Sequence, residues 1–319
     1  MAAETTAAST ASVDARHSAH GDPRRRGRAA TRRRSRVLTY LGLVVASCVA
    51  VFPLLFMVFS SFKDDQQIFA DLGSLKAFLP TGHLSLNNYS GVFERVPAAR
   101  FITNSLVVTV AIVVLGLIVN SMIGFAISRM RWKGKNIVLS LVLATLMVPF
   151  ETIAVPLVYW VAKLPSVQWV VDGFLVKQGM LNTYQVQILP FIANALSIFL
   201  FAQHFGDIPK EIDEAARVDG ASWWTIYSRI GVPLSGPTFA TVAIITMLPA
   251  WNSYLWPLMV IQEESMRPAS VGMQYFFQLN PVWGQIMAYG TLITLPVLII
   301  FVLFQRSFVA SLAGTAVKG

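Results

Sequence analysis

The sequence predicts an all-α, polytopic membrane protein with six membrane-spanning helices. Hydrophobic residues make up 55% of the 319 residues and charged residues only 13%, about half the charged share of a soluble domain. Mean hydropathy is +0.59. Six apolar runs are long enough to cross the hydrocarbon core of a bilayer, which takes roughly 20 helical residues. The runs are residues 37–60, 101–127, 137–162, 184–205, 236–260 and 286–305.

These six runs are predicted to be helices because every backbone polar group inside lipid must be paired within its own segment. Five prolines lie within them, and we expect kinks or breaks there, since proline lacks an N–H and clashes with the preceding turn. These prolines are Pro149, Pro156, Pro190, Pro249 and Pro296.

The first 36 residues differ in composition from the rest of the chain. They are rich in Ala, Thr and Ser and then in Arg, and they hold nine of the 25 Lys and Arg residues. Such a segment has too few apolar residues to form a core, so residues 1–36 are predicted to be a disordered cytoplasmic tail. Its arginines suit an anionic membrane surface. The net charge of +9 is therefore local to this tail, and we expect no nucleic-acid partner.

The distribution of Lys and Arg predicts the orientation of the spans. With the N-terminus inside, 18 of the 25 basic residues fall in inner segments and 7 in outer segments. Basic residues concentrate on the cytoplasmic side of membrane proteins. Both termini are therefore predicted to be cytoplasmic, and so is the segment between the fourth and fifth spans.

That inner segment, residues 207–233, is the long polar stretch between hydrophobic runs. It carries five acids and three bases. Asp207 is predicted to cap a first helix and Gly220 to end it, and Ser222 to cap a short second helix over 223–230. Two interpretations remain open from composition: a docking element for a basic partner, or a solvated loop whose acids suit a helix N-terminus.

Motifs for catalysis or cofactor binding are absent from the sequence. It contains no phosphate-binding loop, no nucleophile-elbow pattern and no zinc-protease pattern. One cysteine and four scattered histidines give no metal-ligand spacing. We therefore expect no catalytic, cofactor-binding or metal-binding residue in this chain.

Polar residues inside the predicted spans are candidates for a substrate pathway. Glu151 either faces a cavity or reaches outer water, because a lone buried carboxylate is costly. Asn194 either lines a pathway or makes a hydrogen bond between helices. Asn252 and Tyr254 lie in the aromatic run 251–258, which is typical of either an interfacial belt or a sugar-binding surface.

The spacing within residues 207–233 adds a family resemblance. Glu214-Ala215-Ala216, three residues, Gly220, nine residues and then Ile-Gly-Val-Pro resembles the coupling-helix motif of ABC-importer permeases, with Val232 where leucine is usual. The resemblance implies contact with a cytoplasmic ATPase through Glu214, Ala215, Ala216, Asp219, Gly220 and Pro233.

Further motifs resemble carbohydrate permeases related to the maltose-transporter subunits. They are residues 102–105, 181–184, 251–257 and the C-terminal 313–319. The likeness runs from about residue 37 to the end and implies a MetI-like permease fold in a bacterial plasma membrane. It also implies a second permease subunit, two ATPase subunits that hold the ATP and Mg, and an extracytoplasmic sugar-binding protein. Two departures are the Arg-rich tail and residues 165–174, which look inserted in an outer loop.

Two rival functions follow from other classes of protein. An ion-coupled secondary transporter would need ionisable residues at mid-membrane and an internal repeat, and neither is clear in this sequence. A membrane-embedded enzyme is disfavoured by the missing catalytic motifs. The identity of the sugar is not encoded in any motif, and a disaccharide such as maltose or trehalose is an expectation at family level.

Overall fold

The computed structural model describes residues 23–170, 173–278 and 280–316, and the chain divides into two units, residues 1–56 and 57–319. Helix α1 (Pro23–Ser60) begins in the first unit and ends in the second. Residues 23–36 of the predicted disordered tail are therefore helical, and residues 1–22 of that tail lie outside the described residues. From Leu38 to Ser60 the helix is apolar and long enough to cross a membrane.

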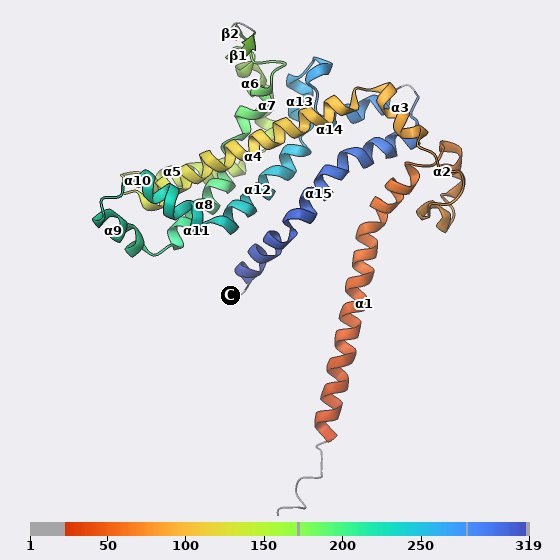
Figure 1. The fold of residues 1–319 in the computed structure, drawn as a ribbon, viewed down its shortest axis with the longest axis horizontal. Helices are drawn as coiled ribbons and strands as arrows, with labels where there is room; N and C mark the ends of the chain where they lie inside the picture. Colours follow the sequence, from red (N-terminus) through yellow and green to blue (C-terminus); the bar gives the residue numbers. More distant parts are fainter. Residues whose placement is uncertain (1–22, 171–172, 279, 317–319) are drawn as a thin grey trace, which may run out of the picture. The chain divides into compact units, whose positions relative to one another are not determined.

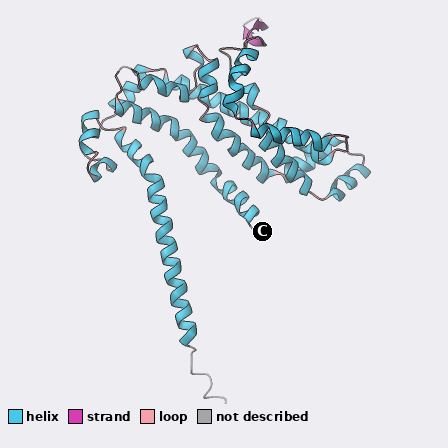
Figure 2. Cartoon of the chain, turned by 180° about the vertical axis from the view of Figure 1, so that it is seen from behind, coloured by secondary structure: helices cyan, strands magenta, loops and turns pink. Residues whose placement is uncertain are grey.

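The second unit is almost entirely helical in the residues described (Figures 1 and 2). Its first elements in chain order are α2 (Asp65–Asp71), η2 (Leu75–Phe78), α3 (Asn87–Arg95), α4 (Ala98–Arg129), α5 (Lys135–Ala144), η3 (Thr145–Met147) and α6 (Phe150–Val161). The middle elements are β1 (Pro165–Val170), β2 (Gly173–Gln178), α7 (Tyr184–Ile188), η4 (Leu189–Phe191), α8 (Ala195–Asp207), α9 (Lys210–Val218) and α10 (Trp223–Ile226). The last are η5 (Tyr227–Gly231), α11 (Val232–Leu234), α12 (Gly236–Trp251), α13 (Leu255–Val260), η6 (Glu264–Met266), α14 (Ala269–Gly272), η7 (Met273–Phe276) and α15 (Trp283–Ala316).

Membrane-spanning helices are present in two forms. By length and composition, three described helices can cross a bilayer: Leu38–Ser60, Ala98–Arg129 and Trp283–Val302. Three helix pairs are also apolar enough but bent, by 103° between Lys135–Met147 and Phe150–Val161, by 45° between Tyr184–Phe191 and Ala195–Asp207, and by 79° between Trp223–Leu234 and Gly236–Trp251. The described chain thus has three spans, or up to six if each bent pair counts as one.

The predicted proline breaks occur at two of the five positions. Pro149 immediately precedes α6 with extended backbone, and Pro190 lies in η4 at the bend between α7 and α8. Pro156, Pro249 and Pro296 lie inside helices that continue through them. The run predicted as one span over 236–260 also ends its first helix at Trp251, before α13 begins.

Helix α4 is the centre of the second unit and packs against α8 and α12. Gly124 allows close approach to α8, because a Cβ there would lie 2.6 Å from Phe201 Cβ and 2.8 Å from the Ala202 backbone N. Apolar clusters then form at both ends of α4. One contains Val92, Phe101, Phe276 and Tyr289, and the other contains Phe125, Phe201, Phe205, Ile226, Tyr227 and Val242.

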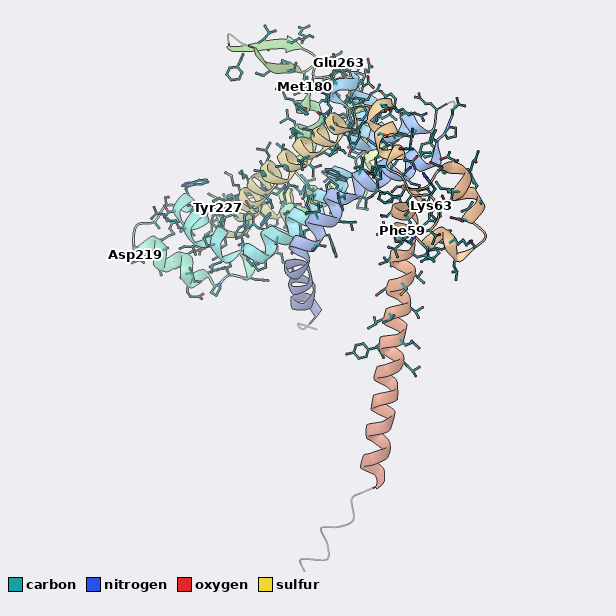
Figure 3. The ribbon with its side chains drawn as sticks, turned by 45° about the vertical axis from the view of Figure 1, so that its right-hand side comes forward. Phe59, Lys63, Met180, Asp219, Tyr227 and Glu263 are labelled. Carbon is teal, nitrogen blue, oxygen red and sulfur yellow. The ribbon has the colours of Figure 1, made fainter. Side chains whose placement is uncertain are left out.

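The segment that looked inserted in the sequence forms an antiparallel hairpin. Strand β1 pairs with β2 from Pro165 opposite Gln178 to Val170 opposite Gly173. The hairpin follows α6 and lies at the opposite end of the unit from α9 and α10 (Figure 1). Figure 3 shows the same two ends through labelled side chains, with Met180 and Glu263 at one and Asp219 and Tyr227 at the other.

Candidate functional site

The polar hairpin, residues 207–233, forms two helices joined by a tight turn. Helix α9 ends in a Schellman motif, in which Ala221 N donates to Ala216 O (2.9 Å) and Gly220 N donates to Arg217 O (3.0 Å). Gly220 has φ +80°, a conformation that side chains with a Cβ disfavour. The predicted helix end at Gly220 is therefore confirmed.

The start of α9 differs from the prediction. Asp207 is the last residue of α8, and Pro209 occupies the capping position of α9. The predicted Asp207 cap is wrong because Ile208, which precedes a proline, is forced into extended backbone with ψ 132° and ends α8 there.

The second helix of the hairpin begins as predicted and continues further. Ser222 is its N-cap, with its Oγ accepting a hydrogen bond from Thr225 N (3.1 Å). After Ile226 the helix widens into a π-helical turn, Tyr227–Gly231, and runs on through α11, which contains Pro233. The hairpin therefore passes into α12 with only a bend at Ser235 and Gly236.

The residues named by the coupling-helix resemblance divide into exposed and packed groups. Glu214, Ala215, Asp219 and Gly220 are exposed, whereas Ala216 is half-buried and packs against the aromatic cluster of Phe125, Phe205 and Tyr227. The exposed side ends in Val218, which is 88% exposed.

A buried ion pair fixes the polar hairpin to the end of α4. Arg129 Nε donates to Asp213 Oδ2 at 2.7 Å, and the two side chains are 3% and 13% exposed. The Arg129 guanidinium also donates to Ile208 O (2.7 Å) and Pro209 O (3.1 Å). One planar cation therefore holds both the first turn of α9 and the chain that leads into it.

Sequence analysis did not identify this ion pair. In the sequence, Arg129 was counted only among the inner basic residues, and Asp213 only among the five acids of residues 207–233. The sequence did contain a signal for it. Asp213 and Glu214 are adjacent, so on a helix of 3.6 residues per turn their side chains point about 100° apart. That places the two acids on different faces of α9.

Aromatic contacts connect the second half of the hairpin to α4 and α8. Tyr227 packs edge-on against Phe125 (centroids 5.4 Å apart), and its hydroxyl lies 2.8 Å from Ser121 Oγ. Phe125 also packs edge-on against Phe205, at 5.4 Å. Both helices of the hairpin are thus attached to the same end of α4.

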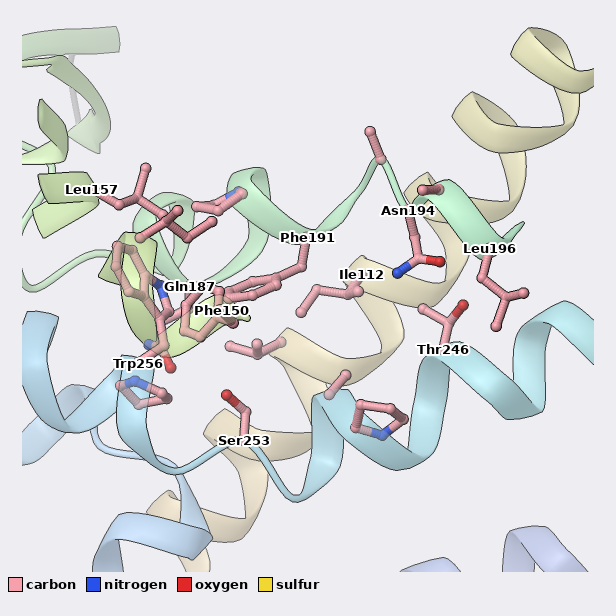
Figure 4. A pocket seen from close by; sticks show the side chains of 18 of the residues that line it. Ile112, Phe150, Leu157, Gln187, Phe191, Asn194, Leu196, Thr246, Ser253 and Trp256 are labelled. Atoms are coloured by element: carbon pink, nitrogen blue, oxygen red, sulfur yellow. The ribbon is translucent and has the colours of Figure 1, made fainter. Parts of the chain in front are cut away.

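A cavity of about 520 Å³ lies near the middle of the helical unit. Its lining is mainly apolar and comes from α4, α6, the α7–α8 break, α12 and α13 (Figure 4). Residues labelled in the figure include Ile112, Phe150, Gln187, Phe191, Asn194, Thr246, Ser253 and Trp256. Gln187 is 2% exposed, and its Oε1 is buried without a hydrogen-bond partner among the described residues.

Of the four polar residues predicted for a pathway, Asn194 lines this cavity. Its Oδ1 caps α8 by accepting from Ser197 N (3.1 Å), and its backbone N donates to Asn120 Oδ1 on α4 (2.9 Å). Asn194 therefore also holds the broken span against α4.

The other three predicted residues lie outside the cavity lining. Asn252 is exposed and its amide donates to Leu248 O (2.9 Å). The Tyr254 hydroxyl pairs with Gln274. Glu151 is exposed in the first turn of α6. Their contribution to a pathway stays a prediction.

Both tryptophans of the aromatic run 251–258 are buried in the helical unit. Trp251 is 6% exposed and donates to Ile293 O (3.1 Å), and Trp256 is 1% exposed and donates to Val186 O (2.8 Å). Buried indoles whose N–H is satisfied are core residues. An interfacial belt is therefore wrong for both, and only Trp256 reaches the cavity.

Several motif residues at the end of the unit opposite the polar hairpin make a clamp between segments that are distant in sequence. Asn104 Nδ2 donates to Ser265 O and Arg267 O, both at 2.9 Å, and Tyr184 donates to Asn104 Oδ1 (2.7 Å). Asn182 adopts φ 58° and accepts from the backbone of residues 262 and 263. These side chains are occupied in holding the outer segments together.

Long apolar helices, broken spans around an internal cavity and an anchored polar hairpin at one end define a multi-pass membrane transport protein. The family described as "Binding-protein-dependent transport system inner membrane component" matches residues 112–314. The chain belongs to this family of permeases.

Three relatives extend the match over nearly the whole chain. The arabinooligosaccharides transport system permease protein AraQ of Halalkalibacterium halodurans is 35% identical over 297 residues, which are 90% of this chain and 99% of the relative. The lactose transport system permease protein LacG of Rhizobium radiobacter is 30% identical, over 89% of this chain and 97% of the relative. The trehalose/maltose permease protein MalG of Thermococcus litoralis is 29% identical, with coverages of 89% and 97%.

Solved structures support the fold. A chain from a bacterial ABC transporter involved in the import of the acidic polysaccharide alginate superposes with a TM-score of 0.72 at 20% identity, over 86% of this chain and 97% of that one. The helix arrangement is therefore that of an ABC importer permease.

Proposed function

We propose that this chain is one permease subunit of an ATP-driven, binding-protein-dependent sugar importer. It forms half of the translocation pathway together with a second permease subunit, and its polar hairpin couples that pathway to cytoplasmic ATPase subunits. The observation that carries the proposal is the hairpin itself: exposed Glu214, Ala215 and Val218 on α9, with Asp213 on another face anchored to α4.

The geometry of the hairpin suits the transmission of a push. The ATPase dimer closes on ATP and Mg, which those subunits hold, and moves α9. Arg129 carries that displacement into α4, and η5 and α11 carry it across the 79° bend at Ser235 into α12. Both helices line the cavity, so their rigid movement opens or closes it. This chain changes no covalent bond.

The proposed substrate is a di- or oligosaccharide delivered by an extracytoplasmic binding protein. Relatives named for arabinooligosaccharides, lactose and trehalose or maltose support this class. A relative named for sn-glycerol 3-phosphate, at 32% identity, shows that the family extends beyond sugars. Among the residues that line the central cavity, Asn194 offers polar groups, and Phe191 and Trp256 offer aromatic surface, to a hydroxylated ligand with an apolar ring face.

Both termini and the polar hairpin are proposed to be cytoplasmic in a bacterial inner membrane. Cysteine replacements at two strongly exposed residues test this: Leu75 (80% exposed) in the outer segment and Val218 at the hairpin. With Cys48 replaced by serine, an impermeant thiol reagent added to intact cells should label the Leu75→Cys variant and spare the Val218→Cys variant. The opposite labelling would invert the topology and remove the basis for coupling.

The function is tested on the assembled complex. Co-purification with this chain should recover a second permease and two ATPase copies, and sugar-loaded binding protein should stimulate ATP hydrolysis in proteoliposomes. Uptake that needs no ATP and stops when an ionophore dissipates the ion gradients would instead support a secondary transporter.

A further inference from the structure

A second cavity, of about 750 Å³, lies beside the polar hairpin. One wall is the loop between α4 and α5, with Arg131, Trp132 and Lys135. The other wall is α9, which contributes Lys210 and Arg217 among others. We call it the basic cavity, and it is separate from the central cavity lined by Asn194.

Cations outnumber acids in the basic cavity. Arg129 and Asp213 lie in its lining but neutralise each other. Four further cations remain against the single carboxylate of Glu214; they are Arg131, Lys135, Lys210 and Arg217. Among the described residues, none of these four forms an ion pair, and Arg217 instead lies over the Trp223 ring, 4.8 Å from its centroid. Uncompensated like charges repel, so a bound anion would stabilise this arrangement.

The apolar surface next to the cavity indicates what kind of anion it suits. Lys135 begins α5, a helix with no buried residue, on which Ile137 and Leu141 are 67% and 63% exposed. These two residues are four apart and share one face. Trp132, 40% exposed, stands at the boundary between the cations and this face. Tryptophan favours that depth in membrane proteins.

We propose that the basic cavity binds the phosphate-bearing headgroup of an anionic phospholipid from the inner leaflet, with its acyl chains along the exposed face of α5. A soluble phosphate would use the cations but not Ile137 or Leu141. Basic pockets at the cytoplasmic side of membrane proteins commonly hold such headgroups. The headgroup would bridge the α4–α5 loop to α9 and so help to hold the polar hairpin. This inference rests on the proposed orientation but not on transport or on the sugar.

The test is the preference of the purified full-length chain for spin-labelled phosphatidylglycerol over spin-labelled phosphatidylcholine, measured by electron paramagnetic resonance. The Arg131→Gln/Lys210→Gln variant should lower this preference about 25-fold, since each of the two basic groups near a membrane surface contributes roughly a fivefold effect. The matched control is Lys133→Gln/Arg229→Gln, which removes one Lys and one Arg from exposed positions in the same segments but outside the cavity lining. It should keep the preference, as should the charge-retaining Arg131→Lys/Lys210→Arg.

Equal losses in both neutralised variants would overturn the proposal, because the Arg-rich tail or general surface charge would then explain the binding. Wild-type protein supplies a measurement that does not depend on the folding of any variant: glycerol 1-phosphate should not displace phosphatidylglycerol at the same concentration. Equal competition would identify a site for soluble phosphate and overturn the lipid. The same comparison is then made with the ATPase bound. If the Arg131→Gln/Lys210→Gln variant and its control no longer differ in lipid preference, a protein side chain fills the cavity, and the lipid proposal is overturned.

Discussion

Two buried cations stabilise opposite ends of the second unit, and they differ in what they connect. At the outer end, Lys63 is fully buried and its Nζ donates to Asp71 Oδ2 (2.9 Å) and Lys76 O (2.7 Å), partners eight and 13 residues away. At the inner end, Arg129 binds Asp213 and two carbonyls about 80 residues away. The outer cation closes a local loop, whereas the inner one joins two distant helices.

The side-chain chemistry suits this difference. Lysine is a compact point charge, which is enough to neutralise one carboxylate and to donate a hydrogen bond to a neighbouring carbonyl. Arginine presents several donors in a fixed plane, so it fixes orientation as well as distance. A helix that must transmit a displacement needs its orientation fixed, and a loop that covers the outer end of the unit does not. The comparison therefore predicts a global effect for loss of Arg129 and a local effect for loss of the Lys63–Asp71 pair.

The largest effect is expected from Arg129→Ala. It leaves the Asp213 carboxylate buried without its partner, which costs about 3–5 kcal/mol for buried ion pairs. We expect α9 to detach from α4, with loss of ATPase co-purification and increased protease cleavage within residues 207–222. Normal ATPase recovery and normal protease resistance would show that this anchor does not hold the hairpin. Arg129→Lys is the matched control and should retain part of the protection, because it keeps the charge but not the planar fork.

Replacing both partners separates anchoring from coupling. The Arg129→Met/Asp213→Leu variant removes the buried charges together, which is often close to neutral for stability. We expect protease resistance to recover well above that of Arg129→Ala, while stimulation of ATP hydrolysis stays reduced because the Ile208 and Pro209 carbonyls have lost their donor. Full recovery of both measurements would mean that apolar packing alone transmits the movement.

The features that could be predicted from the sequence are those that depend on local contacts, and the features that were missed depend on distant ones. Gly220 and Ser222 were identified correctly because a helix end and a cap depend on a few neighbouring residues. The Arg129–Asp213 pair spans 84 residues of sequence, and nothing local to either residue names its partner. Asp207 failed as a cap because Pro209 restricts Ile208, a competing local rule that was given too little weight.

The central cavity shows the same limit. Asn194 was found because a polar residue within an apolar run is conspicuous, and it does line the cavity. Gln187 was not singled out, and Trp256 was noted only within the aromatic run 251–258, since their burial depends on how α7 and α13 pack. Breaks were predicted at Pro149 and Pro190 and do occur there. The sequence did not show which of the five prolines a helix would accommodate without a break. Accommodation depends on neighbouring helices that re-pair the freed backbone groups.

A smaller effect is expected at the turn of the hairpin. Gly220→Ala has open space around it but must adopt φ +80°, which costs about 1 kcal/mol for a residue with a Cβ. We expect weaker ATPase co-purification with unchanged membrane insertion. Gly206→Ala is the matched control, because Gly206 lies in α8 with open space and no positive φ, and there alanine should be neutral or slightly stabilising. Equal behaviour of the two variants would remove the turn from the coupling path.

The smallest effect is expected at the outer pair and should depend on pH. The hydrogen bond and charge of Lys63 hold the pKa of Asp71 below its ordinary value of 3.8. A lowered pKa in the folded state means that the pair stabilises fully above about pH 4, and that this stabilisation is lost as the pH falls through the folded-state pKa. Ala77 is 3% exposed in the adjoining η2, so a thiol there reports local opening.

In a chain with Cys48→Ser and Ala77→Cys, dithiodipyridine should therefore react slowly from pH 7 to 5 and faster below pH 4, after correction for the reactivity of a model thiol. Adding Asp71→Asn should make the labelling fast across the whole range and remove the step, because the amide cannot titrate. Glu94→Gln, on the neighbouring α3 and outside this pair, should preserve the step. ATPase co-purification should stay normal in all three variants, since the outer pair is local. A step that survives Asp71→Asn, or a loss of ATPase recovery with it, would contradict the distinction between a local outer anchor and a long-range inner one.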